Sequence, residues 1–384
     1  MLNISKADKV EIWTGNQAVA EAVILTKPEI VAAYPITPST PIIQALSDAY
    51  EEGRIRGEFI AVESEHAAMS GAIGASVAGA RTFTATASQG LLYMAEMVYW
   101  AGFGRLPMSM CLVNRALAPG WSIWVSHEDL YSMRDAGWIQ LIAKNTQEAH
   151  DLMIHSFRLS EHHDVYMPSM VNIDGFVLSH VAAQVHPLSQ KFVDDFLPPF
   201  EPMFTMDPDD PISFGALTLP NDYLDLRKDH INSMNNAKKI FTDYSNEFAE
   251  LTGRYWGTLI ETYGNQTGDV CIISMGSMSE EVEEVVDELN KRETMMFGSL
   301  RLRSFRPFPT EEIQKITNLF DTFIVLDRAY SLGSDSPLLT EIRNCFYKNR
   351  ADKNIIGKVI GMGGADVNYK QIIDLVISII KETD

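Results

Sequence analysis

The chain has 384 residues, 46% of them hydrophobic, and this length and composition predict two domains with large buried cores. Its formal net charge of −20 argues against a general nucleic-acid binder, because phosphate backbones require a basic surface. No uncharged apolar run reaches the roughly 18 residues of a membrane span, and the first residues lack the basic-then-apolar order of a secretion signal. We therefore expect a cytoplasmic protein that binds neither nucleic acid nor membranes.

The three cysteines, Cys111, Cys271 and Cys345, lie far apart, each in or beside an apolar run. They are expected to be small hydrophobic core residues, and an odd number of buried thiols fits a reducing cytoplasm. No C-x-x-C motif occurs. The chain therefore offers no iron–sulfur or zinc site of its own, and we expect no metal ligands in it.

The first 180 residues alternate between strand and helix patterns. Continuous apolar runs predict strands at 30–34, 59–62, 82–86, 107–113, 138–143 and 166–173. Helices are expected between them, one capped by Asn16, one capped by Ser39 or Thr40, and others across 65–80, 88–97 and 147–160. Strands without polar alternation are typical of sheets covered on both faces. The pattern therefore predicts an α/β fold with a doubly wound, mostly parallel sheet.

Seven prolines punctuate residues 185–222, which predicts an extended crossing segment without regular structure. Apolar residues spaced by three and four then predict a helix across 228–252. A second strand–helix alternation begins near Asp269. We expect a first domain over 1–250, which includes the crossing segment and this helix, and a smaller α/β domain over 251–384.

Polar side chains follow four of the predicted strands, at the edge where open α/β sheets bind ligands. The loops are Pro35-Ile-Thr-Pro38, Glu63-Ser-Glu-His66, Ser88-Gln-Gly90 and Asn114-Arg115. Together they bring hydroxyls, carboxylates and one guanidinium to this edge. These groups suit a small anionic substrate and acid–base chemistry.

Thr37 lies between two prolines, which fix the backbone and leave it little entropy to lose on binding. A rigid hydroxyl beside Arg115 can grip a carboxylate. The plainer alternatives are a tight loop with a helix cap for residues 35–41, and a surface ion pair for Arg115.

Eight stretches of the sequence carry a family resemblance. They are AYPITPSTP (33–41), ESEHAAMSGAIGASVAGARTFTATASQG (63–90), VNRALAPGWSIW (113–124), RDAGWIQL (134–141), NIDGFVLSH (172–180), SMGSMSEE (274–281), RLRSFRPFP (301–309) and VLDR (325–328). In this order they resemble the α subunits of the 2-oxoacid:ferredoxin oxidoreductases, and most closely those of the pyruvate enzymes. The resemblance spans almost the whole chain, except for the proline-rich segment and the last few residues.

The resemblance implies a thiamine diphosphate enzyme that decarboxylates pyruvate, transfers the acetyl group to coenzyme A and reduces ferredoxin, reversibly. The first domain would hold the aminopyrimidine ring of the cofactor, and the second would resemble the transketolase C-terminal domain. Glu65 matches the catalytic glutamate, which hydrogen-bonds a ring nitrogen of the cofactor. Glu63 is its rival, and a carboxylate favoured only by the helix dipole is the structural alternative.

The other site residues also come from the resemblance. Arg115 matches the ligand of the substrate carboxylate, with Thr37 beside it. Pro35, Ser88 and Gln89 are assigned to the cofactor pocket, where the glycine after Gln89 lets the backbone approach closely.

A complete thiamine enzyme also needs a Gly-Asp-Gly…Asn stretch to hold a divalent metal on the diphosphate. Ile173-Asp-Gly175 and Gly268-Asp269 lack that context. The resemblance therefore implies a β subunit that brings the diphosphate site, Mg²⁺ and a [4Fe-4S] cluster. It further implies γ and ferredoxin-like δ subunits with clusters, ferredoxin as electron partner, and a dimer of such heteromers.

Several alternatives stay open. The substrate can be another 2-oxoacid (2-oxoisovalerate, phenylglyoxylate, 2-oxoglutarate or oxalate), or the chain can be a non-catalytic scaffold subunit. A free-standing nicotinamide dehydrogenase is a third rival. Arg301, Arg303 and Arg306 are candidates for an interface or for coenzyme A phosphates. Residues 277–280 are expected to form a helix cap and box, and His162-His163 to lie at a solvated helix end.

Overall fold

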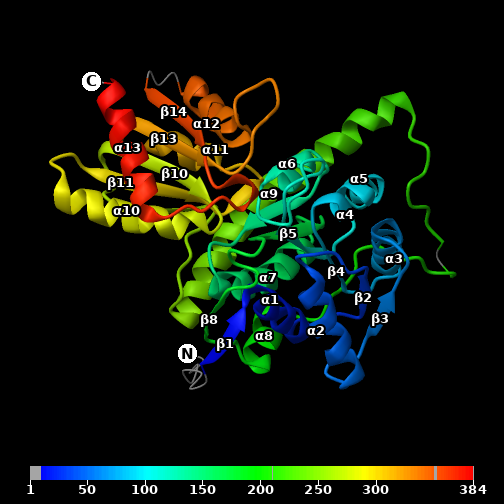
Figure 1. Ribbon diagram of the computed structural model, residues 1–384. Helices are drawn as coiled ribbons and strands as arrows, with labels where there is room; N and C mark the ends of the chain where they lie inside the picture. Colours follow the sequence, from blue (N-terminus) through cyan, green and yellow to red (C-terminus); the bar gives the residue numbers. More distant parts are fainter. Residues whose placement is uncertain (1–9, 210, 350–352, 384) are drawn as a thin grey trace.

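The computed structural model describes residues 10–209, 211–349 and 353–383. Two sheets, each packed between helices, lie side by side (Figure 1). The larger has seven strands in the order β12-β6-β7-β5-β4-β2-β3, and all neighbours are parallel except β12 with β6. Its strands are β2 (Ile30–Ala33), β3 (Glu58–Ala61), β4 (Thr82–Thr86), β5 (Ser109–Asn114), β6 (Ile139–Ile142), β7 (Ser169–Asp174) and β12 (Ser304–Arg306). The predicted doubly wound, mostly parallel α/β fold is confirmed.

Helices cover both faces of this sheet because each turns an apolar stripe toward it. One core lies under α1 (Gly15–Leu25), α2 (Thr40–Glu51), α7 (Thr146–Glu161), α8 (Gln190–Phe196) and α9 (Pro220–Thr252). The opposite core lies under α3 (Glu65–Val77), α4 (Ser88–Tyr93), α5 (Ala95–Phe103) and α6 (Glu128–Ser132). A ribbon of β1 (Glu11–Thr14) and β8 (Ala182–Val185) pairs antiparallel beside the first core.

The smaller sheet has five strands in the order β14-β13-β10-β11-β9, with only β9 antiparallel. These strands are β9 (Ile260–Gly264), β10 (Gly268–Met275), β11 (Phe297–Leu302), β13 (Phe320–Asp327) and β14 (Asn354–Val359). One face packs on α10 (Met278–Arg292) and α13 (Tyr369–Thr383), the other on α11 (Thr310–Ile316) and α12 (Pro337–Lys348). A short 3₁₀ turn, Met362–Gly364, follows β14.

The proline-rich segment differs from its prediction. Residues 190–196 form α8, capped by the Ser189 hydroxyl, and Val193 and Phe196 bury themselves in the first core. The prediction of no regular structure was therefore wrong here, because burial of two apolar side chains outweighed the local proline content. Helix α9 also starts eight residues earlier than expected, at Pro220, since proline is tolerated in a first helical turn.

The second half of the chain is tied into the first sheet. Strand β12 pairs with β6, and the buried carboxylate of Glu148 on α7 contacts Arg301 and Arg303 at 2.7 Å each. These two arginines are 3% and 1% exposed, so they are not free for coenzyme A or a partner chain, and that prediction was wrong. Arg306 also pairs within the chain, with Glu341.

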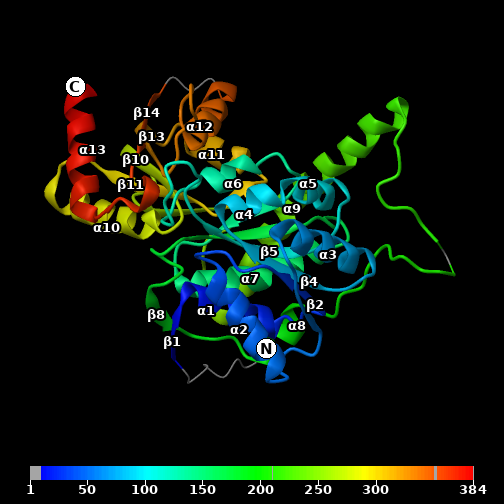
Figure 2. The same cartoon turned by 45° about the vertical axis from the view of Figure 1, so that its right-hand side comes forward.

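The segments 206–209 and 211–219 and the first turns of α9 lie outside both sheets (Figure 2). Large apolar side chains are exposed there, among them Leu217, Leu219 and Leu224. Of the helices that the structure describes, none combines the length and apolar content that a membrane crossing requires.

Candidate active site

Four neighbouring parallel strands, β5, β4, β2 and β3, end at the same edge of the large sheet. The structure brings three of the predicted site residues into direct contact there. Arg115 Nη1 donates a hydrogen bond to the Thr37 carbonyl oxygen at 2.7 Å, and Nη2 donates to Gln89 Oε1 at 2.9 Å. The guanidinium thus spans the loops that follow β2 and β4.

The loop that carries Thr37 is held from inside the protein. Asn16 Nδ2, on buried helix α1, donates to the Pro38 carbonyl at 3.0 Å. The Thr37 side chain is exposed, and no described residue hydrogen-bonds its hydroxyl, whereas Arg115 contacts only its carbonyl. The Thr37 hydroxyl is therefore available to a ligand, as is the exposed ring of Pro35.

Of two predicted helix caps near this loop, the one at Asn16 was wrong, and the one at Ser39 has the predicted position but no capping hydrogen bond. Helix α1 is capped by Thr14, in a capping box with Gln17, so Asn16 is freed to bind Pro38. Ser39 occupies the cap position of α2, but its hydroxyl donates to the Ile36 carbonyl at 2.8 Å instead of capping the helix. Both side chains therefore donate hydrogen bonds to main-chain carbonyls of the loop rather than capping a helix.

Glu65 begins helix α3 and is only 7% exposed, whereas its rival Glu63 is exposed. Ser64 caps the helix by accepting from the Ala67 N–H. Among the described residues, none hydrogen-bonds the Glu65 carboxylate. A buried carboxyl without such a partner costs free energy unless a ligand supplies one.

The Glu65 carboxylate lies in space that a side chain on residue 90 would fill, and Gly90 has none. A methyl group on Gly90 would come within 2.8 Å of Glu65 Oε1 and 2.5 Å of Thr86 Oγ1. The Thr86 hydroxyl is buried and has no partner in the described part of the chain, as is true of Arg115 Nε and Gln89 Nε2. Unpaired polar atoms therefore cluster around Glu65 and Arg115, as expected of a pocket that a polar ring fills.

Ser88 joins the loops after β4 and β5. Its hydroxyl lies 2.7 Å from the Ala116 carbonyl and 2.6 Å from Gln89 Oε1, and its backbone has a φ of 47°. A positive φ is strained for a serine, and such strain is common at functional turns. Ser88 is fully buried, so it shapes this edge from beneath rather than presenting its hydroxyl to solvent.

Burial lowers the pKa of Arg115, while the nearby carboxylates of Asp129 and Glu65 oppose that shift. Asp129, on α6, is fully buried and accepts four hydrogen bonds between the ends of β4 and β5. Sequence reasoning missed this residue, because nothing in the local pattern SHEDLY distinguishes a buried acid from a surface one.

Asp174, in the Ile173-Asp-Gly175 stretch, is fully engaged inside the chain. Its carboxylate lies 2.9 Å from His127 Nε2 and accepts from the Ser277 N–H and hydroxyl, at 3.0 and 2.6 Å. Burial alone would raise the pKa of Asp174, but His127, Arg328 and Ser277 outweigh it and hold the pKa well below its usual range. Ser277 occupies the predicted cap position of α10, but its hydroxyl donates to Asp174 instead of capping the helix, so the predicted box was wrong.

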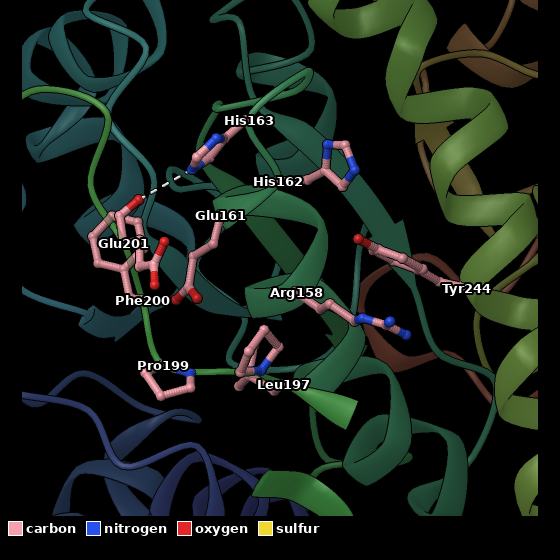
Figure 3. Close-up of a pocket in the computed structure, with 10 residues that line it drawn as sticks. Arg158, Glu161, His162, His163, Leu197, Pro199, Phe200, Glu201 and Tyr244 are labelled. Carbon is pink, nitrogen blue, oxygen red and sulfur yellow. Dashed lines mark hydrogen bonds between the residues drawn. The ribbon is translucent and has the colours of Figure 1, made fainter. Parts of the chain in front are cut away.

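A separate cavity of about 470 Å³ lies beyond the end of α7, away from this edge (Figure 3). Two of its charged groups are already paired: Arg158 with Glu247 on α9, and Glu161 with Arg81. Burial lowers the pKa of His162. In the described ranges no three His, Cys, Asp or Glu side chains are placed so that they could hold a metal ion together. The histidines of this cavity therefore form no metal site.

The large sheet thus carries a buried acid, a guanidinium and a proline-braced loop at one edge, an arrangement that can bind a small anionic or polar ligand. The chain belongs to the pyruvate flavodoxin/ferredoxin oxidoreductase family. The thiamine diphosphate-binding domain of that family matches residues 21–246, and core domain II of pyruvate:ferredoxin oxidoreductase matches residues 268–372. The resemblance found in the sequence is confirmed.

Named relatives agree with this assignment. The chain is 41% identical to pyruvate synthase subunit PorA of Thermotoga maritima, over 94% of this chain and 91% of that protein. It is also 40% identical to ketoisovalerate oxidoreductase subunit VorA of Pyrococcus abyssi, over 94% and 91%.

Solved structures share the fold. A 2-oxoglutarate:ferredoxin oxidoreductase from Magnetococcus marinus superimposes with a TM-score of 0.76 at 20% identity, covering 96% of this chain but only 65% of that one. A split-gene transketolase superimposes with a TM-score of 0.56 at 12% identity, covering 95% and 97%. At these identities the likeness concerns the fold alone, and it confirms the predicted architecture.

Proposed function

We propose that this chain is the α subunit of a thiamine diphosphate-dependent pyruvate:ferredoxin oxidoreductase, which converts pyruvate and coenzyme A to acetyl-CoA and CO₂ reversibly. One observation carries the proposal: Glu65 is buried, has no hydrogen-bond partner among the described residues, and lies at the sheet edge that holds Arg115 and Thr37. The family assignment and the pyruvate synthase relatives support it.

Each site residue has a distinct role in this proposal. When bound, thiamine diphosphate supplies the acidic thiazolium carbon at which a 2-oxoacid loses CO₂. Glu65 hydrogen-bonds the aminopyrimidine ring and holds a proton there. Arg115 and the Thr37 hydroxyl bind the substrate carboxylate, since a guanidinium and a rigid hydroxyl suit that group. Pro35, Ser88 and Gln89 shape the cofactor pocket.

The site is completed by another polypeptide. Asp174, the aspartate of the Asp-Gly pair at the end of β7, is bound to His127 and Ser277, and the described residues contain no metal-ligand cluster. We therefore assign the diphosphate site, Mg²⁺ and a [4Fe-4S] cluster to a β subunit, and further clusters to γ and ferredoxin-like δ subunits. Trp121, an exposed apolar side chain on the loop that follows β5, supports a covered surface at this edge.

The remaining assignments follow from this role. Residues 1–250 form the pyrimidine-binding domain and 251–384 the transketolase C-terminal-like domain, with β12 crossing between them. Coenzyme A is the co-substrate, ferredoxin accepts the electrons, the complex is a dimer of heteromers, and it works in the cytoplasm.

A second substrate class has a specific observation in its favour. The ketoisovalerate oxidoreductase relative is as similar to this chain as the pyruvate synthase relatives are, at 40% identity. Steady-state kcat/KM values with pyruvate, 2-oxoisovalerate, phenylglyoxylate, 2-oxoglutarate and oxalate decide between them. A preference for 2-oxoisovalerate over pyruvate would replace the substrate and leave the reaction type intact.

The reaction type is tested by Glu65→Gln in the chain purified with its co-eluting subunits. We expect pyruvate-dependent ferredoxin reduction to fall by roughly 100-fold or more, because a general acid–base contributes about that much, while the complex still assembles. Glu63→Gln is the matched control and should change the rate little. Near-normal turnover by Glu65→Gln would favour the scaffold alternative.

A further inference from the structure

Asp129 lies where the ends of β4 and β5 meet, and its two carboxylate oxygens face two separate pairs of donors. Oδ2 accepts from the Ser88 N–H at 3.0 Å and from the Arg115 N–H at 2.9 Å. Oδ1 accepts from Asn114 Nδ2 at 2.9 Å and from the Leu130 N–H at 2.8 Å. The side chain is fully buried, so water cannot replace any of these bonds.

Only a charged carboxylate satisfies this arrangement. All four partners are donors, and an ionised aspartate has two acceptor oxygens and no donor. An asparagine offers one oxygen, so in either orientation its NH₂ group would face two N–H donors. Burial raises the pKa of Asp129 to about 6, although its hydrogen bonds lower it. Burying this charge costs free energy, and perturbed buried acids cluster at functional sites, so we infer a functional role for these contacts.

The contacts made by Asp129 converge on the Arg115 guanidinium. The Arg115 main chain is held directly, and its guanidinium reaches Thr37 on one side and Gln89 on the other. Gln89 is in turn placed by Ser88, whose main chain Asp129 also holds in its positive-φ conformation. One carboxylate therefore fixes both the base of Arg115 and one of its two side-chain contacts.

We propose that Asp129 is a positioning residue for the 2-oxoacid: it holds the main chains of Arg115 and Ser88, and so sets where the guanidinium meets the substrate carboxylate. This inference rests on the proposed function, in which Arg115 binds that carboxylate. It assigns no contact between Asp129 and the substrate itself.

The test measures KM and kcat for pyruvate separately in Asp129→Asn. The chain is purified with its co-eluting subunits and assayed at pH 8. We expect KM for pyruvate to rise about tenfold, the loss of one charge-assisted hydrogen bond, and kcat to change less than about threefold. Asp151→Asn is the matched control. Asp151 is equally buried and hydrogen-bonded, to Arg254 and Trp256, but lies away from the site, so its loss should lower stability without changing KM.

A charge swap gives a rescue that a general loss of stability would not show. In Asn114→Asp with Asp129→Asn, the new amide can donate to the new carboxylate, its oxygen stays with the N–H groups of Ser88 and Arg115, and only the Leu130 N–H loses its acceptor. KM for pyruvate in the double variant should therefore fall below that of Asp129→Asn alone, part of the way back to that of the unmodified protein.

Arg115→Lys separates the possible failures. If it raises KM but Asp129→Asn behaves like Asp151→Asn, with unchanged KM, the positioning role is wrong and the proposed function stands. If Arg115→Lys leaves KM unchanged, the carboxylate role of Arg115 is wrong, and the role of Asp129 falls with it.

Discussion

The space at Gly90 gives the sharpest prediction about this site. In Gly90→Ala, the added methyl group would lie 2.5 Å from Thr86 Oγ1, 2.8 Å from Glu65 Oε1 and 3.0 Å from Glu65 Cγ. Comfortable contacts are about 3.5–4.0 Å, so the Glu65 carboxyl must move by roughly 0.5–1 Å. A misplacement of about 1 Å at a reacting group costs on the order of 100-fold in rate, or about 2.7 kcal/mol in the barrier.

The effect of Gly90→Ala on stability is a separate quantity, because the helix preference of alanine offsets part of the overpacking. Gly90 lies within helix α4, where alanine is favoured by up to about 1 kcal/mol, while overpacking costs about 1–3 kcal/mol. With a helix benefit of about 0.5–1 kcal/mol, the net destabilisation is therefore between about 0 and 2.5 kcal/mol. Initial rates of pyruvate-dependent ferredoxin reduction and thermal unfolding of the same preparation measure the two effects.

Gly74→Ala is the matched control for this experiment. Gly74 lies on helix α3, the helix that Glu65 begins, and an added methyl group there has nothing within 4 Å. We expect it to raise stability by about 0.5–1 kcal/mol and leave the rate unchanged. The reasoning is refuted if Gly90→Ala keeps a rate within threefold of the unmodified protein.

Two further predictions concern buried charges. Glu148→Gln should destabilise the chain by about 3 kcal/mol in denaturant unfolding, because it leaves the buried Arg301 and Arg303 without their shared carboxylate. Glu247→Gln, which breaks a half-exposed pair, should cost less than about 1 kcal/mol, and equal losses would contradict the argument. The second prediction concerns pH: since the pKa of Asp129 is raised to about 6, its carboxylate is protonated below that pH and loses acceptor capacity. KM for pyruvate should therefore rise as pH falls through about 6, and Asp129→Asn should show no such inflection.

Local patterns in the sequence determined the elements that build this site. Continuous apolar runs marked β4 and β5, and the prolines around Thr37 marked a rigid loop, because these signals depend on neighbours in the chain. The rule that ligands bind at the carboxyl ends of parallel strands then placed Glu65 and Arg115 at one edge. The sequence by itself therefore defined the fold class and the loops of the candidate site.

Two of the errors arose where a side chain's partner is distant in the sequence. Asn16 bonds Pro38, 22 residues away, instead of capping its own helix. Arg301 finds Glu148 across 153 residues and becomes an internal anchor rather than a contact for coenzyme A. No local pattern encodes these pairings, because only folding brings the two partners together.

Asp129 shows the same difference between local sequence and tertiary structure within the candidate site itself. In the sequence it is one acid among several, whereas the folded chain surrounds it with four donors, one of them 41 residues away at Ser88. The sequence determined which groups reach the sheet edge, since strand ends are set by local hydrophobicity. Only the tertiary structure decided which of those groups are free and which are held, because hydrogen bonding in a buried region depends on packing between distant segments.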